Sequence, residues 1–346
     1  MIDAIFRAKA PLRISFCGGG TDVSPYPEER GGVVLSATID KYAYASLRPI
    51  EGNVVRITSF DFEITREHPL GKPIPLGTEL DLISGVVNHF QFREGGDPFP
   101  TGCEIFLHSD APPGSGLGSS STMVTTLVGA LAEWLRIPLT QYEVAERTFR
   151  IERQELKLAG GRQDQYAATF GGFNFIEFYG DHTVVTPLKL RRDILCELEY
   201  SLLLCYTGRT RLSAHIVENQ MQSYRAGKPE VSRALDEMKR IAIEMKALLL
   251  RDRLVEFGRR LHEAWLFKRD LDPAISNPQI DSMYEAARAE GAIGGKILGA
   301  GGGGYLLVQA PFDRKHQVAK ALRELGGEVV PFAFEERGLQ TWIARG

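Results

Sequence analysis

The stretch Ala111-Pro-Pro-Gly-Ser-Gly-Leu-Gly-Ser-Ser-Ser-Thr122 joins a predicted strand at 104–108 to a long apolar helix predicted over 119–136. The first turn of a helix has free N–H groups and the positive end of the helix dipole, which together bind phosphate. The three consecutive serine hydroxyls at the start of this helix add donors and oxygen ligands for a metal ion. The stretch therefore predicts a phosphate-binding loop; the alternative is a helix N-cap with a flexible lead-in.

Two other nucleotide-binding loops do not match this stretch. A Walker A loop requires a lysine after its last glycine, and Ser119 follows Gly118 here. A dinucleotide-binding fingerprint has the spacing G-x-G-x-x-G and an acidic residue at the end of a second strand. The glycines here are spaced G-x-G-x-G, and Glu133 lies within the continuing helix. Both motifs are therefore excluded.

The length and composition of the chain indicate a globular protein of two domains. Its 346 residues exceed the size at which one core usually stops growing. Hydrophobic residues make up 43% and charged residues 25%, which excludes a disordered or fibrous chain. The net charge of −3 provides no broad attraction to nucleic acid or to anionic membranes, so we expect neither as a partner.

The chain also has no features of an exported or membrane-bound protein. Its apolar runs, such as 202–205 and 247–250, are far shorter than the roughly 20 residues of a membrane helix. Asp3 near the start and the lack of an apolar segment argue against a signal peptide. The cysteines have no zinc-binding or disulfide-framework spacing. We expect a cytoplasmic protein, with a homo-oligomer left open.

The order of predicted elements indicates an α+β fold. In the first half we expect strands at 10–16, 33–48, 54–58 and 104–108, helices at 79–92, 119–136 and 140–158, and a hairpin at 174–178 and 183–187. In the second half we expect strands at 198–206, 295–298, 305–309 and 328–334, and helices at 211–224, 229–250, 253–271, 278–290 and 313–325. Strands precede helices in each half, which predicts two packed domains, 1–190 and 191–346, with a boundary near 185–195.

Three segments resemble the ordered motifs of the GHMP kinases, the superfamily of galactokinase and of homoserine, mevalonate and phosphomevalonate kinases. Residues 112–121 resemble the motif P-x-x-x-G-L-G-S-S, residues 9–22 the N-terminal motif, and residues 296–305 the C-terminal motif. The resemblance implies the two-domain GHMP kinase fold, with a ribosomal S5 domain 2-like N-terminal domain and a ferredoxin-like helical C-terminal domain. It also implies ATP and Mg²⁺ as cofactors.

The resemblance assigns the residues that hold the nucleotide and the metal. The implied ATP-binding residues are Pro113, Gly114, Ser115, Gly116, Leu117, Gly118, Ser119, Ser120 and Ser121. The implied Mg²⁺ ligands are Ser120 and Glu152, since magnesium prefers hard oxygen ligands. Glu152 lies in a charged helical segment, so the alternative is a solvated surface carboxylate.

The resemblance also implies a catalytic pair. Asp164, in Gly160-Gly-Arg-Gln-Asp-Gln-Tyr166, resembles the aspartate of the G-x-x-D-Q segment in galactokinase-like members and would act as the base. Arg13 falls where galactokinase has the arginine of A-P-G-R, although this chain reads A-P-L-R. A fixed cation there would keep Asp164 ionised. The alternatives are a solvated aspartate and an outward-facing strand arginine.

The N-terminal loop points to the acceptor. Galactokinases carry G-E-H-T-D-Y there, whereas this chain has Gly18-Gly19-Gly20-Thr21-Asp22, which suits a larger or phosphorylated sugar. The stretches 13–22, 36–42, 161–168, 171–175 and 206–213 resemble the D-glycero-D-manno-heptose 7-phosphate kinases. These enzymes phosphorylate the anomeric C1 hydroxyl in making nucleotide-activated heptose for bacterial surface polysaccharide. The implied substrate-binding residues are Gly19, Gly20, Thr21, Asp22, Gly172, Arg209, Arg211, Gly301 and Gly302, with Arg209 or Arg211 meeting the substrate phosphate. The alternatives are another sugar-1-kinase, for fucose or a related hexose, and a catalytically silent sensor of sugar and ATP.

Overall fold

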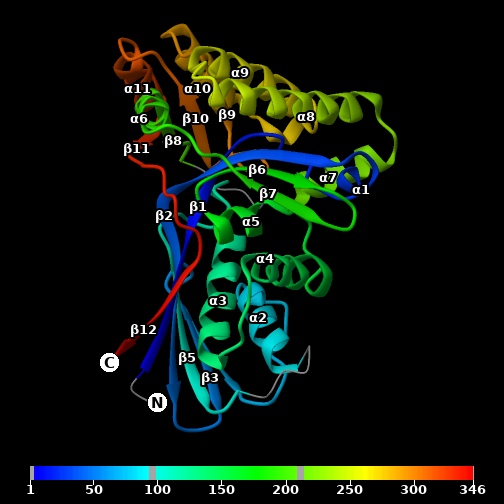
Figure 1. Cartoon of the computed structure of the whole chain (residues 1–346), viewed down its shortest axis with the longest axis vertical. Coiled ribbons are helices and arrows are strands. Elements are labelled where there is room, and N and C mark those ends of the chain that lie inside the picture. Colours follow the sequence, from blue (N-terminus) through cyan, green and yellow to red (C-terminus); the bar gives the residue numbers. More distant parts are fainter. Residues whose placement is uncertain (1–3, 93–98, 209–213, 346) are drawn as a thin grey trace.

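The computed structural model describes residues 4–92, 99–208 and 214–345 and divides their strands between two sheets (Figure 1). The larger sheet contains β1 (Ala4–Cys17), β2 (Gly32–Ile50), β3 (Val54–Ser59), β4 (Ile64–Pro69), β5 (Gly102–Ser109), β6 (Phe173–Phe178), β7 (Thr183–Pro187) and β12 (Gln340–Arg345). Its order is β12-β1-β2-β5-β3-β4, and β6 pairs with both β2 and β7. The smaller sheet has the order β11-β8-β10-β9 and contains β8 (Leu202–Tyr206), β9 (Gly294–Ile297), β10 (Tyr305–Gln309) and β11 (Glu328–Val330).

Helices are present in both halves of the chain (Figure 1). The first half holds α1 (Tyr26–Arg30), α2 (Asp81–Phe92), α3 (Ser119–Leu135), α4 (Gln141–Phe149), the π-helical turn η1 (Arg150–Glu155) and α5 (Gln163–Phe170). The second half holds α6 (Arg192–Ser201), α7 (Ala214–Arg225), α8 (Pro229–Leu250), α9 (Leu254–Arg269), the 3₁₀ turn η2 (Pro273–Ile275), α10 (Pro278–Ala289) and α11 (Lys315–Glu324). The predicted α+β class is confirmed.

The long strand β2 connects two parts of the larger sheet. Its residues 32–37 pair with β6, its residues 43–50 pair with β5, and β1 pairs with both parts. The register of β1 against β2 shifts after Pro11 and again after Ser15, and such irregularities re-aim side chains. Arg13 lies between the two shifts, so the direction of its side chain depends on these irregularities as well as on strand pairing.

Separate hydrophobic cores hold the helices on the sheets. Apolar residues of α2 and α3 pack with Ile57 and Ile105 of the larger sheet, and all are buried. Another core joins the two halves of the chain, because Leu12 and Phe16 of β1 pack with Phe257 and Leu261 of α9. The rings of Phe16 and Phe257 meet edge to face at 5.3 Å. Residues 12–16 of β1 are therefore held in place by contacts from both halves of the chain.

Three predicted elements were wrong in extent. The strand predicted at 198–206 begins only at Leu202, because Ile194 and Leu198 form the buried face of α6. The helix predicted at 140–158 has the expected capping box at Thr140 but becomes π-helical from Arg150 and ends at Glu155. The strand predicted at 328–334 ends at Val330.

The last strand was not predicted at all. β12 pairs antiparallel with β1, so the end of the chain returns to the sheet where it began. Figure 1 shows the N- and C-terminal ends of the chain side by side at this edge. Its partner lies more than 300 residues away in sequence, beyond the reach of any local pattern.

Candidate functional site

A buried ion pair lies at the meeting point of β1, α5 and the loop that begins α3. The Nε of Arg13 donates to Oδ1 of Asp164 at 2.8 Å, and its second terminal nitrogen lies 2.7 Å from the same oxygen. The Arg13 side chain is 4% exposed and that of Asp164 is 22% exposed. The structure therefore brings the two predicted catalytic residues together, with the arginine enclosed and the carboxylate partly open.

The predicted phosphate loop lies directly against this pair. Arg13 also donates to the carbonyl oxygen of Gly116, and its backbone N–H donates to Leu117. A Cβ atom on Gly118 would lie 3.2 Å from Cγ of Asp164. Since α3 begins immediately after Gly118, the free N–H groups of its first turn and the Asp164 carboxylate border the same space.

The C-terminal glycine loop packs on the phosphate loop. The N–H of Tyr305 donates to Ser115 O at 3.0 Å. A Cβ atom on Gly299 would lie 2.5 Å from Cα of Gly116, so only glycine allows this approach. Gly301 and Gly302, predicted to bind substrate, are buried, and the Gly302 N–H donates to Ile275 O at 2.8 Å. In this structure the C-terminal glycine loop therefore packs against the phosphate loop and supports it.

Glu152 lies in the π-helical turn and is 1% exposed. The hydroxyl that reaches it is that of Ser121, which donates to Oε1 at 2.9 Å, and the side-chain amide of Gln165 donates to Oε2. Burial raises the pKa of the Glu152 carboxyl, and the nearby Arg153 guanidinium opposes this. Ser120 is exposed one residue earlier on the helix.

These residues offer the oxygen ligands that Mg²⁺ prefers, and magnesium in phosphoryl-transfer sites commonly uses one or two carboxylates with phosphates and waters. The chemistry of Glu152 and the serine hydroxyls therefore fits such an ion. A carboxylate that is buried with a raised pKa also gains most from a cation nearby.

Asp22 fastens the N-terminal glycine loop to the start of α5. The Asp22 carboxylate is buried and accepts from the backbone N–H groups of Gly20, Arg162 and Gln163 at 2.9 to 3.0 Å. The buried Thr21 hydroxyl donates to the carbonyl oxygens of Gly18 and Val33. Both side chains thus hold backbone, and Asp22 positions the helical turn that carries Asp164.

The remaining predicted substrate residues are spread around this centre. Gly19 lies beside the Gln163 side chain, and the Gly20 carbonyl accepts from Gln220 of α7. The Gly172 N–H donates to Thr38 Oγ1 at 2.7 Å and to Glu335 O at 3.1 Å. Arg209 and Arg211 lie outside the described residues.

Two buried lysines, which sequence reasoning missed, lie behind the site. Nζ of Lys296 donates to Ser15 O at 2.7 Å, and Nζ of Lys268 donates to Ile297 O at 3.1 Å and to Gly299 O. Burial lowers the pKa of Lys296 to about 8 and lowers that of Lys268 further below its ordinary value. Gln165 was also missed. The only sequence signal for these residues was a position in or beside one of the motifs, and such a position does not reveal that a side chain is buried.

The lowered pKa of Lys296 predicts a pH-dependent stability. Between pH 8 and 10.5 the unfolded chain binds more protons at this lysine than the folded chain, so the group's contribution to stability rises with pH. From pH 7 to pH 9, we expect the unfolding free energy of wild type to increase by about 1 kcal/mol relative to that of Lys296→Met. Urea denaturation at several pH values measures this difference. The exposed-lysine variant Lys189→Met should show no such trend, and a pH-independent difference for Lys296→Met would contradict the assignment.

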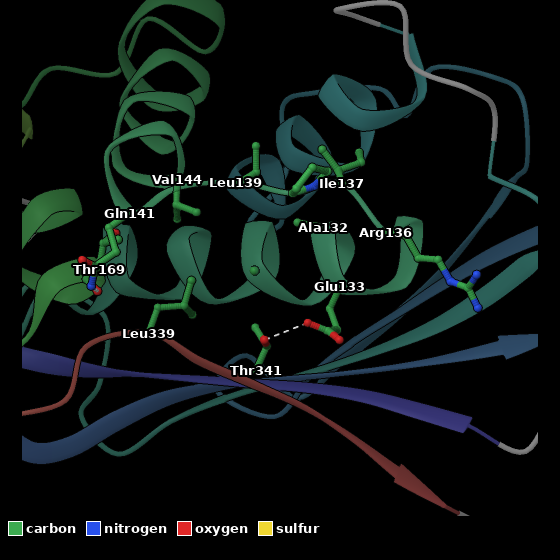
Figure 2. Close-up of a pocket in the computed structure, with 12 residues that line it drawn as sticks. Ala132, Glu133, Arg136, Ile137, Leu139, Gln141, Val144, Thr169, Leu339 and Thr341 are labelled. Atoms are coloured by element: carbon green, nitrogen blue, oxygen red, sulfur yellow. Dashed lines mark hydrogen bonds between the residues drawn. The ribbon is translucent and has the colours of Figure 1, made fainter.

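A cavity of about 520 Å³ lies elsewhere, between the C-terminal half of α3, the segment that leads into α4, and β12 (Figure 2). Figure 2 shows Glu133 and Thr341 on one side of it, joined by a hydrogen bond of 2.9 Å. Its walls contain none of the predicted site residues that the structure describes. The phosphate loop and the ion pair therefore remain the candidate active site.

Among the described residues, no helix is long and apolar enough to cross a membrane.

Both halves of the chain match profiles of one known family. The profile of the GHMP kinases N terminal domain matches residues 81–172, and that of the GHMP kinases C terminal domain matches residues 245–328. The chain is 35% identical over 339 residues to D-glycero-alpha-D-manno-heptose 7-phosphate kinase of Campylobacter jejuni subsp. jejuni serotype O:2, covering 97% of this chain and 98% of the relative. It is 28% identical over 352 residues to L-fucokinase/L-fucose-1-P guanylyltransferase of Bacteroides fragilis, covering 95% of this chain but 37% of that protein.

A solved structure agrees over the same length. The crystal structure of a D-glycero-D-manno-heptose 1-phosphate kinase from Bacteroides thetaiotaomicron has a TM-score of 0.82 and 36% identity, covering 97% of this chain and 98% of the other. The N-terminal profile match includes the phosphate loop and Asp164, and the C-terminal match includes both buried lysines.

Proposed function

Because this chain belongs to the GHMP kinase family, and is therefore a kinase that transfers phosphate to a hydroxyl acceptor, we propose that its acceptor is D-glycero-D-manno-heptose 7-phosphate. The product would be the 1,7-bisphosphate, an intermediate for nucleotide-activated heptose. The observation that supports the chemistry best is the Arg13–Asp164 pair beside the loop before α3. The similarity along the whole chain to a heptose 7-phosphate kinase supports the choice of sugar.

In this proposal the chain's own residues position and neutralise the reacting groups. Asp164 accepts the proton of the C1 hydroxyl as that oxygen attacks the γ-phosphorus of ATP, and the phosphorus–oxygen bond to ADP breaks in line. Arg13 keeps the carboxylate ionised and offsets the charge that develops on the transferred group. The first turn of α3 holds the nucleotide phosphates. Magnesium, when bound by Glu152 and the serine hydroxyls, would neutralise phosphate charge. The reaction would take place in the cytoplasm.

An ADP-release assay with MgATP tests the acceptor. The panel is heptose 7-phosphate, mannose, mannose 6-phosphate, fucose and galactose, and we expect strong turnover with heptose 7-phosphate alone. Efficient turnover of unphosphorylated fucose would overturn the proposed acceptor in favour of another sugar-1-kinase. If no sugar is turned over while ATP still binds, a sensor of sugar and ATP becomes the better description.

A further inference from the structure

A cavity of about 360 Å³ adjoins the clamp that Asp22 makes on α5. One wall comes from the π-helical turn and the residues after it, including Arg153 and Lys157, and another comes from α7, including Arg225. Arg162, at the start of α5, also lines it. The cavity is thus formed by both halves of the chain, next to the turn that carries Asp164.

The cations around this cavity are of two kinds. Arg153 donates to Gly161 O at 3.3 Å, and Arg162 donates to Glu28 at 2.6 Å and lies over the Phe149 ring, so these two arginines already hold the walls. Lys157 and Arg225 are exposed. Neither forms an ion pair with any residue in the described part of the chain.

The carboxylates that line the cavity do not pair with Lys157 or Arg225. Asp22 is saturated by the backbone N–H groups that it accepts, and Glu218 lies 3.5 Å from His215 at the cavity's edge. Arg162 pairs with Glu28 and Arg153 lies 3.7 Å from Glu152, so the cations of the lining that remain without an ion pair among the described residues are Lys157 and Arg225. Two unpaired lysine and arginine donors on two walls of a pocket of this size suit a phosphate group.

We propose that this cavity binds the phosphate at the far end of the sugar substrate, with Lys157 and Arg225 contacting it from the two halves of the chain, in place of the Arg209 or Arg211 expected from the sequence. The inference rests on the proposed function and extends it to the origin of the phosphate requirement. Asp22 accepts from Arg162 and Gln163, the two residues before Asp164, so the cavity and the base share one turn. In this proposal the sugar places its C1 hydroxyl at Asp164 and its opposite end in the cavity.

Steady-state kinetics with heptose 7-phosphate test the assignment. In Lys157→Gln and in Arg225→Gln we expect the KM for heptose 7-phosphate to rise about tenfold each, because each loses a charge-assisted contact. The kcat and the KM for ATP should stay within about twofold, since neither side chain meets ATP in this proposal. The matched controls are Lys189→Gln and Arg251→Gln, which remove exposed cations away from the cavity. Unchanged KM values in both cavity variants would overturn the phosphate site while leaving the kinase function intact.

Equilibrium binding separates this proposal from the choice of sugar. Calorimetry without ATP would compare mannose 6-phosphate with mannose on wild type and on the Lys157→Gln/Arg225→Gln double variant. We expect wild type to favour the phosphorylated sugar and the double variant to lose that preference, whichever phosphorylated sugar is the true acceptor. Equal binding of both sugars by wild type would overturn the cavity assignment even if heptose 7-phosphate is turned over. Thermal melting confirms that the variants are folded.

Discussion

Replacing Asp164 with asparagine is expected to lower kcat for sugar phosphorylation by about 10²–10⁴-fold, the range lost when a positioned general base is removed. Asparagine keeps the size of the side chain and one oxygen that can accept from Arg13, which donates to Oδ1 in wild type at 2.8 Å. The KM for ATP should change little, because Asp164 faces the phosphate loop without belonging to it. ADP release under saturating substrates measures the effect.

The control for this variant is Asp313→Asn, which removes an exposed carboxylate just before α11 and should leave kcat unchanged. Thermal melting should show both variants folded. A folded Asp164→Asn protein with the wild-type kcat would exclude Asp164 as the base. If kcat were unchanged in Asp164→Asn but fell in a folded Arg13→Gln, charge neutralisation by the arginine would carry the reaction instead.

The Arg13–Asp164 pair could be predicted because motif resemblance fixes residue types at sites far apart in the sequence. These two residues are 151 positions apart, and no periodicity links them. The motif resemblance does not contain the structural reason why Arg13 and Asp164 meet. The irregular register of β1 aims Arg13, and Asp22 holds the turn that presents Asp164. That Asp22 accepts from backbone groups of another element could not be inferred from its own neighbourhood.

Secondary structure was predictable where one local pattern dominates. The apolar spacing of α8 gave its bounds, Pro229–Leu250, and the Thr140 capping box marked the start of α4. Prediction failed where tertiary structure decides. The π-helical turn buries Glu152 against Ser121, and β12 forms only because β1 offers an edge at the other end of the chain.

The C-terminal glycine loop packs on the phosphate loop, and we expect the phosphate loop to depend on this contact. The variant Gly304→Ala is expected to show this most directly. Gly304 has φ +86°, and a Cβ atom there would lie 2.2 Å from the backbone oxygen of Ser115 in the phosphate loop. Because the obstructing atom is backbone, the phosphate loop itself must move. We expect a loss of about 3 kcal/mol in unfolding free energy, from the strained backbone and the displaced contact together. We also expect kcat/KM for ATP to fall by about 10²-fold, since small displacements of positioning groups are costly.

Gly326→Ala is the matched control that separates strain from contact. Gly326 has nearly the same backbone angle, φ +82°, but nothing lies within 4 Å of a Cβ atom built there. Alanine at this position should therefore cost only about 1 kcal/mol of stability and leave ATP kinetics unchanged. If both variants lost the same stability and kept wild-type kcat/KM for ATP, the contact between the glycine loops would have no role in holding the phosphate loop. A loss of ATP kinetics in Gly304→Ala alone would mean that the C-terminal motif acts on the nucleotide through Ser115, whereas Asp164 lies against Gly118 of the same loop.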